Sequence, residues 1–96
     1  MGALFTNSTG VSNSAFGTHS LFSNVSGNRN TAIGDSAGRN VVLGSNNTCV
    51  GYNSQPSTGS VSNEITLGDN QITTIRANVT SITSLSDVRD KKNIKD

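Results

Sequence analysis

The chain has 96 residues, of which 31% are hydrophobic and 4% aromatic, with no tryptophan. An ordinary globular core of this length needs more apolar side chains than that. Charged residues make up 14% and the net charge is +1, which excludes the basic stripe of a nucleic-acid-binding domain and the high charge of most disordered chains. Half of the residues are Asn, Ser, Thr or Gly, so we expect a repetitive β structure in which backbone pairing replaces a large core.

Membrane insertion is not expected, because no apolar run is long enough to span a bilayer. No basic leader followed by a long apolar stretch is visible after Met1, so we expect no signal peptide. The one cysteine, Cys49, excludes an intrachain disulfide. These features predict assembly in a cytoplasm.

A period of seventeen residues runs through most of the chain, and internal periods of this kind indicate stacked repeats. Residues 4–20 align without gaps on residues 21–37, with seven of seventeen positions identical. Two series of glycines and one of asparagines share the period. The first glycine series is Gly17, Gly34, Gly51 and Gly68, the second is Gly10, Gly27 and Gly44, and the asparagines are Asn13, Asn30 and Asn47.

The residues before the first glycine series predict short strands. Each glycine follows an apolar residue, and a small residue stands one step earlier, so the two face opposite sides of a strand. We expect the apolar residues to fill a narrow interior and the small ones to let a neighbouring layer come close. The expected core residues are Phe16, Ile33, Val50 and Leu67.

The glycines and asparagines of the repeat predict its corners, where a positive φ would strain other residues. Two glycines per turn then predict two corners and two strands per coil. Residues 52–62 break the pattern and are expected to form a loop, because Pro56 is unsuited to a central strand.

After Gly68 the spacing of apolar residues changes. Ile72, Ile75, Val79 and Ile82 are separated by three, four and three residues, which is the spacing of a short trimeric coiled coil. Because the residues between them are mostly Thr and Ser, which are poor helix formers, we expect an intertwined β stalk and keep the coiled coil as the alternative.

One apolar residue per turn cannot offset the entropy of ordering seventeen residues. We therefore expect partner chains to complete the core. The predicted fold class is all-β: a homotrimeric parallel β-roll or β-solenoid with 17-residue coils over residues 1–68, followed by the stalk over 69–85.

The segment Asn30-Thr31-Ala32-Ile33-Gly34 and its equivalents at 13–17 and 47–51 resemble the head repeat of trimeric autotransporter adhesins. Chains of that family form a trimeric parallel β-roll. The same repeat is similar to segments in tail fibres of phages and of large algal viruses. The resemblance covers residues 4–68.

Residues 85–94 (LSDVRDKKNI) resemble the opening of the intramolecular chaperone domain of the S74 peptidase family. That domain stands at the C-terminus of phage tail spikes and fibres, trimerises them and then cuts itself off. The resemblance implies that residues 86–96 begin such a domain, with Ser86 as nucleophile and Lys91 as its base. A lysine acts as a base only when burial or a nearby charge lowers its pKa. Nothing in the 96 residues would bury Lys91, so we expect no proteolysis by them alone.

These resemblances predict a structural and receptor-binding distal part of a trimeric viral tail fibre or spike, located in the virion and not an enzyme. The expected partners are two further copies, the upstream fibre and a host cell-surface receptor, with carbohydrate as one candidate. The alternatives are the head of a bacterial trimeric autotransporter adhesin and the non-catalytic stub of a polysaccharide-degrading tail spike.

The remaining reactive residue types have structural interpretations. His19 is a lone corner residue, and Cys49 takes the place of Ala15 and Ala32 in the repeat, which predicts a packed thiol. No metal site and no cofactor are expected: Asp35, Asp69 and Asp87 form no calcium loop, and Glu64 lacks a partner carboxylate. Receptor contact is expected at the corner loops, including that of Tyr52.

Overall fold

The structure, a computed structural model, describes residues 2–4, 7 and 9–85. Within this part of the chain there is no helix, and four short strands form one sheet in the order β1-β2-β3-β4 with every pair parallel. The predicted all-β class is confirmed at this level. The strands are β1 Ser14–Phe16, β2 Thr31–Ile33, β3 Thr48–Val50 and β4 Ile65–Leu67.

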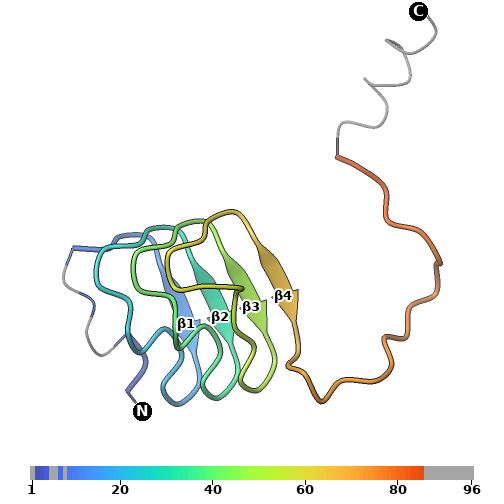
Figure 1. The fold of residues 1–96 in the computed structure, drawn as a ribbon, viewed down its shortest axis with the longest axis horizontal. Helices are drawn as coiled ribbons and strands as arrows, with labels where there is room; N and C mark the ends of the chain where they lie inside the picture. The colour runs from blue at the N-terminus through green and yellow to red at the C-terminus, as the bar shows by residue number, and fades with distance from the viewer. Residues whose placement is uncertain (1, 5–6, 8, 86–96) are drawn as a thin grey trace, which may run out of the picture.

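Successive strands lie side by side because the chain winds in coils (Figure 1), and the strand register shows that each coil has seventeen residues. We number the coils by the sequence repeat as first (4–20), second (21–37), third (38–54) and fourth (55–71). Ala15 pairs with Ala32, Ala32 with Cys49, and Cys49 with Thr66. The predicted period is therefore the actual register of the sheet. Each coil contributes one strand among the described residues, so the prediction of two strands per coil is wrong. Residues 52–62 contain no strand, as expected.

The two faces of the strands are assigned the wrong way round in the sequence-based prediction. The small residue in the middle of each strand points into the coil: Ala32 and Cys49 are fully buried, and Ala15 packs against the same cluster. The apolar residue that follows it points outward. The expectation that Phe16, Ile33, Val50 and Leu67 fill the interior of the coil is wrong, since all four are exposed on this chain.

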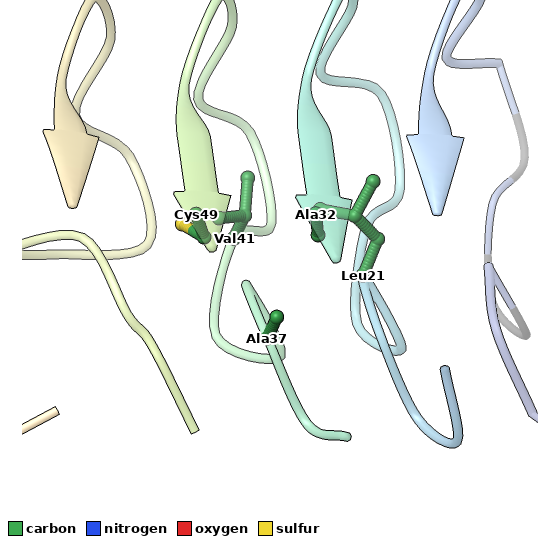
Figure 2. Packing of buried hydrophobic residues seen from close by; sticks show 5 residues of the cluster. All are labelled: Leu21, Ala32, Ala37, Val41 and Cys49. Atoms are coloured by element: carbon green, nitrogen blue, oxygen red, sulfur yellow. The ribbon is translucent and has the colours of Figure 1, made fainter. Parts of the chain in front are cut away.

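The interior is narrow, and the large side chains in it alternate between coils (Figure 2). Leu21 fills the second coil, and the equivalent residue of the third coil is Gly38, where an added Cβ would lie 3.0 Å from the Leu21 side chain. Val41 fills the third coil at the position that Asn24 holds in the second. The strand residues Ala32 and Cys49, which face these side chains, are small in both coils. The buried cluster is Leu21, Ala32, Ala37, Val41 and Cys49.

The corners of the coils follow the first glycine series. Gly17, Gly34, Gly51 and Gly68 directly follow the strands with φ between 82° and 126°, a region that glycine adopts without strain. The second glycine series and the repeated asparagines have no positive φ, so the left-handed conformation predicted for them is wrong. The residue before each asparagine position takes the left-handed conformation instead. These residues are Ser12, Arg29, Asn46 and Asn63, with φ between 58° and 66°.

The segment after β4 leaves the stack of coils (Figure 1). Asp69 makes a turn there, because its carboxylate accepts a hydrogen bond from the Gln71 N–H at 3.0 Å. Residues 70–85 are exposed and contain neither strand nor helix. Neither form of the predicted stalk is present in the single chain, and the stalk residues Ile72, Ile75, Val79 and Ile82 are uncovered.

Candidate functional site

A ladder of buried asparagines joins the coils beside the sheet. The Asn30 Oδ1 accepts a hydrogen bond from the Asn47 backbone N–H at 2.9 Å, and its Nδ2 donates to the Gly44 carbonyl at 2.8 Å. Asn13 makes the equivalent pair to Asn30 N–H and the Gly27 carbonyl, at 2.9 and 2.8 Å. Each side chain thus satisfies two backbone groups of the following coil, which a buried amide must do.

The second glycine series lies next to this ladder and permits the close approach of the coils. A Cβ added to Gly27 would point at the Gly44 carbonyl oxygen, and one added to Gly44 would point at the Val61 carbonyl oxygen. Both would lie closer than 3.0 Å, a separation that real Cβ atoms essentially never reach. Gly10 has the same relation to Gly27. Glycine is required here by contact between backbones and not by dihedral angle.

The ladder ends at Glu64, which stands at the asparagine position of the fourth coil. Its N–H still donates to the Asn47 Oδ1 at 3.0 Å. Its carboxylate turns back within the same coil and accepts hydrogen bonds from the Ser57 N–H and Oγ, at 3.0 and 2.7 Å. The bond from the Ser57 backbone, followed by that from its hydroxyl, lowers the pKa of Glu64 from its ordinary value of 4.5.

The outer face of the sheet carries exposed apolar side chains from all four strands. Each strand contributes one side chain to a row on this face. The exposed fractions are 76% for Phe16, 47% for Ile33, 37% for Val50 and 58% for Leu67. Parallel register places them in line. Ile65, also exposed, adds to this face at its C-terminal end. We call this row the outer apolar row; a contiguous exposed row of this kind is typical of an interaction surface.

The corner loops form a second, polar surface. Tyr52 is exposed at the corner of the third coil, and an open hollow beside it is lined by Asn53, Gln55, Asp69 and others at the end of the stack. On the first two coils, His19 lies edge-on to Phe22 with ring centroids 5.0 Å apart. The Arg39 guanidinium lies 5.5 Å from the Phe22 centroid. His19 is therefore part of a ring cluster, and it has no metal-ligating neighbours within the described residues.

Cys49 is buried, as the repeat predicts. Burial, and to a lesser extent the Glu64 carboxylate, raises the pKa of its thiol, so the neutral thiol is favoured over the nucleophilic thiolate. Over residues 2–4, 7 and 9–85 no three His, Cys, Asp or Glu side chains group to hold a metal ion, and no helix is long and apolar enough to cross a membrane. Ser86 and Lys91 lie outside the described residues, and their assigned roles stay predictions.

Sequence reasoning found the ladder asparagines by their period but missed what they do. The signal was present: only a side chain with both a donor and an acceptor recurs at that position until Glu64. Comparison with family models, curated proteins and solved structures found no match for this chain.

Proposed function

We propose that this chain is a structural and receptor-binding part of a trimeric viral tail fibre or spike. The observation that carries the proposal is the outer apolar row: Phe16, Ile33, Val50 and Leu67 are aligned on one face, and nothing in the described chain covers them. Burying such a row against copies of itself supplies the apolar area that the narrow interior lacks.

Three-fold association also accounts for the segment after β4. Ile75, Val79 and Ile82 are exposed on an extended single chain, where nothing offsets their contact with water. Three such segments wound together bury them, as a β stalk or as a coiled coil. The homotrimeric β-roll and the stalk are therefore two parts of one proposal, and both depend on the same partner copies.

Receptor contact is proposed for the corner loops. Tyr52 is exposed and is not part of the outer apolar row. The hollow at the end of the stack borders on that row, because Leu67 is among the residues that line it. Loops held on a rigid scaffold are where proteins usually recognise ligands. We also propose that the fibre matures by self-cleavage. This part rests only on the resemblance of residues 85–94 to the S74 chaperone.

The experiment is the solution mass of the 96-residue chain by light scattering, with circular dichroism on the same sample. We expect a β-rich trimer. The double variant Ile33→Asp and Val50→Asp should lower the mass to that of a monomer, because carboxylates on the buried face are not solvated. The matched control Thr31→Ser and Thr48→Ser changes the same strands without touching the row and should stay trimeric. A folded wild-type monomer would contradict the proposal.

A further inference from the structure

The two ends of the coil stack differ, and the difference lies in two residues of the last coil, Val61 and Glu64, and in Ile72, which follows it. In the first three coils, the glycine of the second series lets the next coil approach. The equivalent residue of the fourth coil is Val61. Because an added Cβ on Gly10, Gly27 and Gly44 points each time at the next coil's carbonyl, the Val61 side chain stands where a fifth coil's backbone would lie.

Two further changes close the same end. Glu64 stands in place of the ladder asparagine, and its carboxylate accepts hydrogen bonds from Ser57 of the same coil. It therefore has no amide that could bond the backbone of a following coil. At the corner, the space beside Gly17 and Gly34 is occupied by the glycine of the next coil, whereas the space beside Gly68 is occupied by the Ile72 side chain. The C-terminal end is therefore a cap of the kind that terminates stacked repeats.

Among the described residues of the first coil, the N-terminal end carries none of these changes. The side chain of a ladder asparagine forms hydrogen bonds with the backbone of the following coil, so each inner coil is bonded by an asparagine of the coil before it. The Gly27 carbonyl, for example, accepts from Asn13 at 2.8 Å as well as from Asn24 at 3.3 Å. The equivalent Gly10 carbonyl accepts from Asn7 at 3.0 Å and has no predecessor's asparagine among the described residues. Over the same residues the Asn13 N–H has no acceptor, although the Asn30 and Asn47 N–H groups each have one.

Both ends of the sheet present an unpaired parallel edge, since β1 pairs only with β2 and β4 only with β3. Backbone pairing is therefore available at either end, and the side chains distinguish the two. A second ladder of hydrogen bonds runs along the exposed side of the coils. The Val11 N–H donates to the Asn28 Oδ1 at 2.8 Å, and the Asn28 N–H donates to the Ser45 Oγ at 3.0 Å. Since this ladder starts at Val11, whose side chain is no acceptor, an incoming coil would leave its own N–H at that position to water.

From this asymmetry we propose that the N-terminal end of the stack is a docking face for one more coil of the same 17-residue type. The incoming coil carries glycine and asparagine at the positions of Gly27 and Asn30, so that its amide bonds the Asn13 N–H and the Gly10 carbonyl. A second copy of this chain cannot supply it, because the end that would meet β1 is closed by Val61 and Glu64. The proposal concerns each chain separately and holds whether or not the fibre function is correct.

The test inserts a copy of residues 21–37 at either end of the 96-residue chain, between Ala3 and Leu4 or after Gln71. We expect the N-terminal insertion to raise the thermal midpoint and to slow amide exchange of Asn13 about tenfold or more. A matched insertion with Ala for its ladder asparagine and Val for its glycine should give neither effect, and the C-terminal insertion should add no stability. If the parent chain is unfolded, the β content of the three insertion variants is compared by circular dichroism instead, and the N-terminal insertion should have the highest.

An N-terminal insertion that behaves like its matched control, or a C-terminal insertion that stabilises equally, would overturn the proposal. A second variant tests the cap directly. The triple variant Val61→Gly, Glu64→Asn and Ile72→Ala removes all three changes at the closed end, so copies should now stack end to end and the mass should rise with concentration. A wild-type chain that itself grows into end-to-end assemblies would show that no cap exists.

Discussion

The side chain of Asn30 and the backbone of Asn47 are joined by a hydrogen bond of 2.9 Å across seventeen residues of chain. Asn30 is fully buried, and so is Asn47. Every buried side-chain nitrogen and oxygen atom in the described residues has a hydrogen-bond partner. Burial removes the hydrogen bonds that the amide and two backbone groups would make to water. The hydrogen bonds between the amide and these backbone groups replace them, which stabilises the polar interior of the stack.

Asn30→Ala should destabilise the fold strongly. The change leaves the Asn47 N–H and the Gly44 carbonyl buried without a partner, and each such group costs roughly 1–3 kcal/mol. We expect a loss of about 2–4 kcal/mol in the free energy of unfolding, measured by urea denaturation. Asn40→Ala, on an exposed side chain, is the matched control and should change stability by less than about 0.5 kcal/mol. Similar losses for the two variants would show that the ladder contributes nothing.

Gly44 and Val61 occupy equivalent positions and should respond differently to substitution. Gly44→Ala places a Cβ against the Val61 carbonyl, and the coils must separate, at a cost of about 1–3 kcal/mol. Val61→Gly faces no following coil and should cost about 0.5–1 kcal/mol through added backbone freedom. The thermal midpoints of both variants check this; a larger loss from Val61→Gly would contradict the close-approach explanation.

Glu64 should make stability depend on pH in the acid range. Its pKa is lowered in the folded state by the two bonds from Ser57, so the folded state binds this proton less readily than the unfolded one. The stabilisation is present above the ordinary value of 4.5 and is lost as pH falls through the lower folded value. Glu64→Gln should make the thermal midpoint depend less on pH between about 6 and 3, the range over which carboxylates titrate. An unchanged pH profile in Glu64→Gln would rule out this carboxylate as the source.

Cys49 should be unreactive in the folded chain. Burial favours its neutral thiol, so modification by a thiol reagent at about pH 8, half a unit below the usual thiol pKa, should be slow and should accelerate in denaturant. Cys49→Ala should cost less than about 1.5 kcal/mol, because Ala32 fills the same position one coil earlier. Cys49→Leu should cost about 1–3 kcal/mol by overpacking the narrow interior. Rapid labelling of the native protein would contradict the buried location.

Much of the coil stack could be predicted from the chain itself. The seventeen-residue period places all four strands, because glycine, asparagine and alternating side chains recur in register and parallel pairing preserves that register. The glycine corner after each strand also follows from sequence, since a positive φ is required there. Cys49 could be placed in the packed row because Ala15 and Ala32 share its position.

Only the tertiary structure decided which side of each strand is inside. Alternation along three residues separates Ala32 from Ile33 but is the same whichever faces inward. The interior of the coil decides it: the space that Ala32 and Cys49 face is already filled by Leu21 and Val41, and Ile33 points outward. The close approach of the coils makes Asn30 a ladder residue and Glu64 the last of its row. These roles depend on contacts seventeen residues apart, whereas a local pattern carries only the conformation of the chain within one coil.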